Sequence, residues 1–188
     1  ATAAFVGIEG LTIAARGIEV GVNQVRSTTP DAQALDFSRL LDGGFAVLAG
    51  GESVTLDFDS ALLRVSVADA TISISEFFYI RGGFAFEKGR EMEITTTTGG
   101  TKMVSVVTFG LSNVYAFAGI GGPYWVDSDG DGVLTSADEP DADGALGLAL
   151  SGVDMGLALF RPIDVADTAS YMALKATADQ ATFAGLPD

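Results

Sequence analysis

The sequence contains neither cysteine nor histidine. Without cysteine there are no disulfide bonds and no thiol chemistry, so the domain must be stabilised by its core or by bound metal ions. Without histidine, the Ser-His-Asp and Cys-His arrangements of nucleophilic enzymes are excluded. Zinc is also disfavoured, because carboxylates are the only strong metal ligands that remain. We therefore expect that the chain is not an enzyme.

Basic residues are scarce: 10 Lys and Arg stand against 25 Asp and Glu, for a formal net charge of −15. Such a surface repels phosphate backbones and anionic lipids, so nucleic-acid binding is not expected. The uncharged run of residues 103–126 is long enough to span a bilayer. It contains Gly, Ser, Thr and Pro residues, a composition that favours two paired strands over membrane insertion.

Apolar residues make up 48% of the chain, and 24 of the 188 residues are glycine. This content is enough for a single β-rich repeat module over residues 1–188, and the glycines indicate many tight turns. The dominant period is two, as in strands that place one side in the core. The alternating apolar residues are Leu11 and Ile13; Ile18, Val20 and Val22; Val54, Leu56 and Phe58; Leu63, Val65 and Val67; Ile72 and Ile74; Phe84 and Phe86; Met92 and Ile94.

We predict an all-β fold, either a β-sandwich or an elongated β-solenoid-like module, with many short strands and at most one or two short helices. One candidate helix begins with Thr29, Pro30 and Asp31 and ends at Gly43. Residues 34–41 also alternate well enough for a strand, and residues 164–175 are equally ambiguous. Residues 121–144 predict one long loop, and a loop of this length usually has a function or binds a metal.

Two internal similarities are present. The motif LSNV at residues 111–114 resembles LSGV at 150–153 and, more loosely, ARGI at 15–18. Asn and Gly tolerate positive φ, so we expect each copy to form a hairpin or β-arc between two strands. Residues 3–8 (AAFVGI) match residues 181–186 (ATFAGL). We interpret this match as one repeat followed by the start of the next within residues 181–188.

The sharpest motif is DSDGDGVLTSADE at residues 127–139. It fits the twelve-residue calcium loop, in which alternate residues converge on one ion and Gly132 allows the sharp turn at position six. Three aspartates this close would repel one another without a cation, so we expect bound Ca²⁺. The expected ligands are Asp127, Asp129, Asp131, the backbone carbonyl of Val133, Thr135 directly or through water, and Asp138.

The loop differs from those of helix-loop-helix sensors. Asp138 stands where a bidentate Glu is usual, Glu139 is one residue late, and Pro140 prevents an exiting helix. We therefore expect a lone structural site, closed by Asp138 or Glu139, which Asp141 and Asp143 could extend. The loop resembles those of dockerin modules and thrombospondin type 3 repeats, and this resemblance implies calcium.

Two weaker candidates have simple structural explanations. Asp57 and Asp59 flank Phe58 on a predicted strand and could be a glycosidase carboxylate pair, but a solvated strand face explains them better. Tyr124 and Trp125 could form a sugar-binding platform, although such rings more often anchor a loop by burial. A carbohydrate-binding module with a glycan ligand is therefore the alternative function.

With this calcium loop, the matching ends and the Cys-free acidic composition, the chain resembles a module of giant, tandemly repeated bacterial secreted or cell-surface proteins of the adhesin type. The resemblance implies an extracellular or cell-surface location and a structural or adhesive role in which calcium rigidifies an array. It implies like modules as partners, in the same chain, a homo-oligomer or a filament. Since both ends of the sequence are strand-like, we also expect a terminal strand to complete a neighbour's sheet.

Overall fold

The computed structural model describes residues 10–29, 32–40 and 42–186 and is almost entirely β-structure. Among these residues the one helix is a short 3₁₀ turn, η1 (Phe37–Arg39). The strands are β1 (Leu11–Asn23), β2 (Phe45–Ala49), β3 (Glu52–Leu56), β4 (Leu62–Ile74), β5 (Phe78–Thr95), β6 (Thr101–Ile120), β7 (Leu146–Pro162), β8 (Tyr171–Thr177) and β9 (Gln180–Ala184). The prediction of an all-β fold is confirmed.

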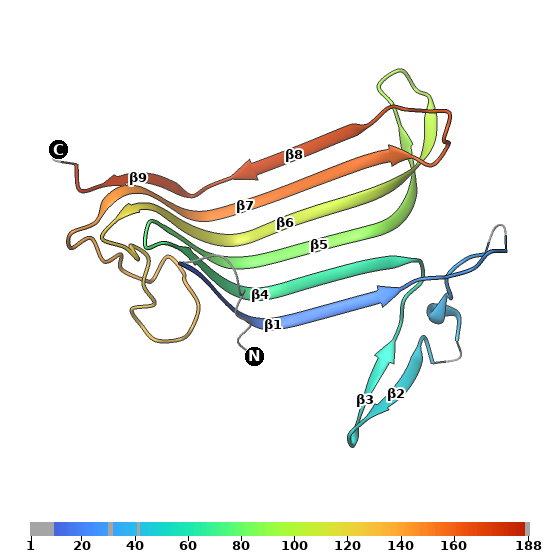
Figure 1. The fold of residues 1–188 in the computed structure, drawn as a ribbon, viewed down its shortest axis with the longest axis horizontal. Helices are drawn as coiled ribbons and strands as arrows, with labels where there is room; N and C mark the ends of the chain where they lie inside the picture. The colour runs from blue at the N-terminus through green and yellow to red at the C-terminus, as the bar shows by residue number, and fades with distance from the viewer. Residues whose placement is uncertain (1–9, 30–31, 41, 187–188) are drawn as a thin grey trace.

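Seven strands form one antiparallel sheet in the order β1-β4-β5-β6-β7-β8, with β9 paired to β7 beyond the end of β8 (Figure 1). Antiparallel neighbours of this kind make up the sheets of β-sandwiches. Strands β2 and β3 form a separate hairpin that projects from the sheet. Strand β1 lies at one edge, and β8 and β9 lie at the other.

The strands of the large sheet are long because bulges join segments that the sequence pattern separates. All three copies of the short motif lie inside strands, in β1, β6 and β7, so the expectation of hairpins or β-arcs there is wrong. Gly17, Asn113 and Gly152 do adopt positive φ, at 60°, 48° and 57°. The β6–β7 register shifts around Asn113 and Gly152, and the β4–β5 register shifts between Val67 and Ala70. Each bulge takes up an extra residue without ending the strand.

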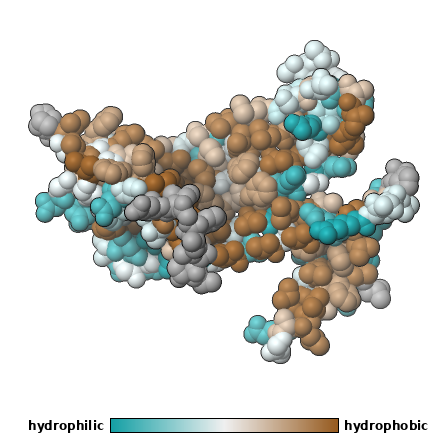
Figure 2. Space-filling model, viewed as in Figure 1, coloured by the Kyte–Doolittle hydropathy of each residue, from teal (hydrophilic) through white to brown (hydrophobic). Residues whose placement is uncertain are grey.

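Directly opposed residues of antiparallel strands point to the same face, so the register defines rows of side chains across the sheet. Four rows are apolar throughout and share one face, because their β5 members (Phe78, Ile80, Phe84 and Phe86) are separated by even numbers of residues. We call this the apolar face, and Figure 2 shows hydrophobic side chains gathered over the middle of the sheet. From β1 to β8 or β9 the rows are Val20, Val65, Phe86, Phe109, Leu157, Leu174; Ile18, Val67, Phe84, Leu111, Met155, Ala176; Ile13, Ile72, Ile80, Ala116, Leu150, Ala181; and Leu11, Ile74, Phe78, Ala118, Leu148, Phe183.

A buried core lies on the other face, at the end of the sheet that the long loop covers. Its members are Phe117, Tyr124, Ala145, Ala149 and Ala184, with Tyr79 and Trp125 packed against them. The alternating residues of β1 and β4 were expected to point into the core. They lie instead on the apolar face, where Val20 remains 62% exposed, so this part of the prediction is wrong.

Several local expectations change. Residues 103–126 form most of the single strand β6 and the start of the following loop, not two paired strands. In the described part of residues 29–43, the expected helix is reduced to η1. Residues 164–175 form turns and then enter β8. Within the described residues, no helix is long and apolar enough to cross a membrane. The match between the two ends is not tested, since residues 3–8 lie outside the described residues.

Candidate metal centre

The long loop is held against the sheet by aromatic side chains. It runs between the end of β6 at Ile120 and the start of β7 at Leu146, which confirms the loop expected at residues 121–144 (Figure 1). The ring of Tyr124 is buried and stacks on Phe117, with centroids 5.6 Å apart. Trp125 packs edge-on against Tyr124 at 4.8 Å.

Trp125 also donates a hydrogen bond from Nε1 to the carbonyl oxygen of Ala116 at 3.1 Å. Both loop rings are therefore committed to contacts with the sheet. A sugar-binding platform needs a ring face open to solvent, so this packing supports an anchoring role for Tyr124 and Trp125.

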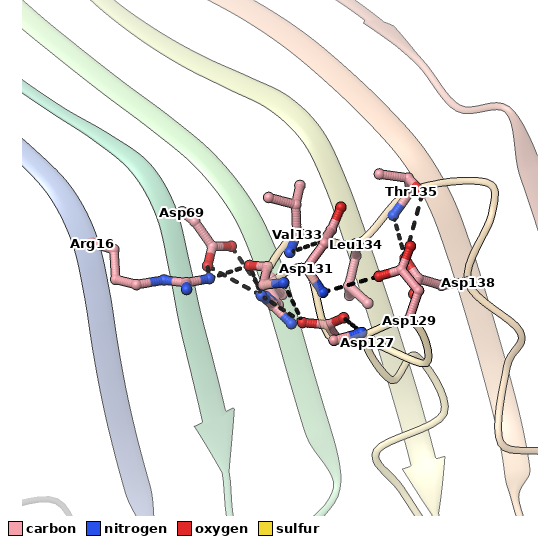
Figure 3. Close-up of polar contacts among 12 residues, drawn as sticks. Arg16, Asp69, Asp127, Asp129, Asp131, Val133, Leu134, Thr135 and Asp138 are labelled. Atoms are coloured by element: carbon pink, nitrogen blue, oxygen red, sulfur yellow. Dashed lines mark hydrogen bonds and ion pairs between the residues drawn. The ribbon is translucent and has the colours of Figure 1, made fainter.

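An acidic turn follows the aromatic anchor. Carboxylate oxygens of Asp127, Asp129 and Asp131 all lie within 4.8 Å of one another (Figure 3). Asp127 accepts hydrogen bonds from the amides of Gly130 at 2.8 Å and Gly132 at 2.7 Å. Both glycines have positive φ, at 76° and 90°. The sharp turn expected at Gly132 is therefore present, and it brings alternate aspartates to one point.

The other two aspartates form the same kind of local turn. Asp129 accepts from the amide of Asp131 at 3.0 Å, and Asp131 accepts from the amide of Val133 at 2.7 Å. Each of these carboxylates offers about four acceptor sites, so these bonds leave lone pairs free for a cation. The donor set is entirely oxygen, which suits a hard ion such as Ca²⁺ or Mg²⁺.

Asp138 joins the two ends of the calcium motif through Ser128 and Thr135, and we call this point the neck of the loop. Its two oxygens accept hydrogen bonds from the amides of Ser128 at 2.8 Å and Thr135 at 2.7 Å. The bond from Thr135, together with that from Ser128, lowers the pKa of Asp138 against the opposing effect of its burial. Of the predicted ligands, the structure gathers three aspartates, while Asp138 and Thr135 bond to each other across the neck.

The acidic residues after the motif take different positions. Glu139 contributes its amide to the neck, donating to the hydroxyl of Ser128 at 3.1 Å. Asp141 accepts from the amide of Asp143 at 3.1 Å. Among the residues that the structure describes, the acids close enough to share a metal ion are Asp127, Asp129 and Asp131. Glu139, Asp141 and Asp143 are not part of this cluster.

Two arginines of the sheet hold the turn from beneath (Figure 3). Arg16 of β1 and Arg81 of β5 both donate to the carbonyl oxygen of Gly132. Asp69 of β4 accepts from Arg16 at 2.7 Å and from Arg81 at 3.1 Å. Burial raises the pKa of Asp69, but the hydrogen bonds from the two arginines outweigh it, and the net shift is downward. Arg81 also lies 4.0 Å from Asp127, so its charge offsets part of the repulsion within the acidic turn.

This arginine contact was not predicted. Arg16 and Gly132 are 116 residues apart, so the sequence carries no local signal for it. Asn113 adds a second unpredicted link, donating from its side chain to the carbonyl oxygen of Leu134 at 2.8 Å. The repeated motif containing Asn113 did mark this position as unusual.

The predicted carboxylate pair lies elsewhere. Asp57 and Asp59 are exposed and follow the end of β3 at Leu56. The prediction that they lie on a strand is therefore wrong. No hydrogen bond or ion pair links the two in the described residues. Their position fits a solvated connection between β3 and β4.

Comparisons with known proteins find no family model, no curated protein and no solved structure that matches this chain.

Proposed function

We propose that the chain is a calcium-stabilised structural module of an extracellular or cell-surface protein. The observation that carries the proposal is the convergence of Asp127, Asp129 and Asp131 in a loop whose sequence follows the twelve-residue calcium pattern. Three carboxylates within 4.8 Å repel one another, and a bound divalent ion would remove that cost. Extracellular calcium is millimolar, so even a weak site of this type would be filled there.

Calcium would act on stability through the position of the loop. The acidic turn directly follows Trp125, and its backbone at Gly132 is tied to two strands through Arg16 and Arg81. An ion that fixes this turn also fixes Tyr124 over Phe117, at the centre of the buried core. Metal binding and core packing would therefore be coupled.

A structural role also fits the edges of the sheet. Strand β1 and strands β8 and β9 occupy opposite edges, so like modules could add to either side by strand pairing. The proposed partners are neighbouring like modules in the same chain, a homo-oligomer or a filament.

The test is a calorimetric calcium titration of the chelator-treated protein, with melting curves in calcium and in chelator. We expect one saturable site, and calcium at a hundredfold excess over its Kd should stabilise by about 2.7 kcal/mol. For a chain of this length this corresponds to a rise in Tm of roughly 5–10 °C. A parallel magnesium titration tests selectivity, because Mg²⁺ demands a tighter octahedral site.

The variant Asp129→Ala should weaken calcium binding at least tenfold, or about 1.4 kcal/mol. Asp57→Ala, which removes the same charge from an exposed position after β3, should bind calcium as the wild type does. Absence of saturable binding at millimolar calcium, or equal binding by the two variants, would contradict the proposal.

A further inference from the structure

The apolar face keeps much of its surface open. Each of its four rows crosses six strands without a charged or polar side chain. In the row at one end of the face, Val20 is 62% exposed, Phe109 is 40% exposed and Leu174 is 58% exposed. Soluble monomers rarely expose contiguous apolar patches larger than a few hundred Å².

The size of the face matches that of a stable protein interface. Six strands about 4.8 Å apart span about 24 Å, and the nine-residue separation from Leu11 to Val20 spans about 30 Å. The footprint between the outermost Cα atoms is therefore roughly 700 Å², and the side chains around it add to this area. A stable complex buries about 800 Å² on each partner, so the face is large enough to form such an interface.

The distribution of charge favours a second copy of the chain as the partner. The chain carries a net charge of −15, yet none of the residues in the four rows is charged. The charged groups of the sheet near the loop, Arg16, Asp69 and Arg81, belong to the opposite face, where they contact that loop. Lys88 of β5 lies on the same face, one row beyond Phe86, and is exposed, so it belongs to the rim of the four rows. Two copies can therefore meet through the four rows without burying an unpaired charge.

The half of the face that contains Phe109 is also hollowed. A cavity of about 420 Å³ is lined by side chains that include Val65, Phe84, Phe109 and Met155. Phe86 and Phe109 lie beside it with ring centroids 5.0 Å apart. Large side chains from a facing sheet could enter such a hollow, as they do in the cores of β-sandwiches.

We propose that two copies of the chain pack apolar face to apolar face, as the two layers of a sandwich about 10 Å apart. The arrangement is isologous, so the same residues of the face are buried on both copies. It leaves the calcium loop on the outside of each layer and the sheet edges free. The dimer is independent of the proposed calcium site and of strand pairing at the edges.

The first test is the mass in solution, by sedimentation velocity in calcium at micromolar protein. The wild type should have twice the monomer mass of 19.3 kDa. Phe109→Glu places a charge on the apolar face, on the middle strand β6, and should give a monomer with unchanged circular dichroism. Leu48→Glu makes the corresponding change on the β2–β3 hairpin, where Leu48 is 86% exposed, and should remain a dimer.

The second test does not depend on the stability of that glutamate variant. Because the chain has no cysteine, Phe109→Cys and Leu48→Cys each give one labelling site. A spin label at 109 should be immobilised by the facing sheet, which packs about 10 Å away. A label at 48 should stay mobile.

A monomeric wild type with a mobile label at 109 would overturn the proposal, as would a dimer that survives Phe109→Glu. Flotation of the monomer with neutral phosphatidylcholine vesicles would also overturn it, by assigning the face to lipid. The calcium titration reads out a different face, so failure of one proposal leaves the other standing.

Discussion

Replacing Phe117 with alanine tests whether the contact between loop and sheet is the main source of stability. The Phe117 ring is 2% exposed, stacks on Tyr124, and belongs to the one cluster of buried residues found in the described part of the chain. Removing a buried phenylalanine side chain costs about 3–5 kcal/mol, which includes the cavity it leaves. Because domains are stable by only about 5–15 kcal/mol, we expect the loss of about a fifth or more of the total.

The assay is urea unfolding followed by fluorescence, since Trp125 is the single tryptophan and packs on Tyr124 within this cluster. We expect a lower midpoint with an unchanged slope. The matched control is Phe77→Ala, in the turn between β4 and β5, where Phe77 is 52% exposed. The control should change stability by no more than about 0.5 kcal/mol. A loss below about 1 kcal/mol for Phe117→Ala, or equal losses for both variants, would refute the assignment of the core.

Two further predictions concern the bulges and the arginine contact. Gly152→Ala should destabilise by about 1–2 kcal/mol in urea unfolding, because Gly152 has φ of 57° and an added Cβ would overlap the carboxylate of Asp179. The control is Gly156→Ala in the same strand, whose added Cβ meets nothing within 4 Å and which should be nearly neutral. Equal effects of the two variants would contradict the bulge geometry. The pKa of Asp69 is lower in the folded state than in the unfolded chain, so its contribution to stability is present above the unfolded pKa of about 4 and is lost as the pH falls through the folded value. Unfolding free energies measured from pH 6 to pH 2 should therefore fall less steeply for Asp69→Asn than for the wild type, and identical slopes would show that the contact with Arg16 and Arg81 does not form in solution.

Local features of the fold could be predicted where neighbouring residues determine them. Residues 96–100, three threonines followed by two glycines, form the turn between β5 and β6, as these residue types favour. The calcium-loop pattern places Asp127, Asp129 and Asp131 together, because the turn at Gly132 depends on few residues. Period-two alternation identified strands, and in β1, β4 and the first half of β5 it grouped the apolar residues on one face. The bulge between Lys88 and Arg90 turns Met92 and Ile94 to the other face.

The location of the buried core could not be predicted in the same way. Alternation shows which side chains share a face, but it does not show which face another segment covers. Ala149 is fully buried although it is small, because the loop and β9 close over it. Val20 has a larger apolar side chain than Ala149, yet it stays exposed on the edge strand β1. Burial here depends on contacts between residues far apart in the sequence.

The bulges explain how one chain can have a continuous apolar face and an anchored loop. In β4 the apolar residues are odd-numbered up to Val67 and even-numbered from Ile72, so a regular strand would turn one set to the opposite face. The extra residue between Val67 and Ala70 corrects this change of phase. The corresponding bulge in β6 contains Asn113, which bonds to the loop at Leu134. The change of phase within an alternating segment is thus a readable sequence signal for a bulge. The bulges keep the apolar side chains on one face, which is free to meet another copy, while the opposite face holds the candidate metal loop.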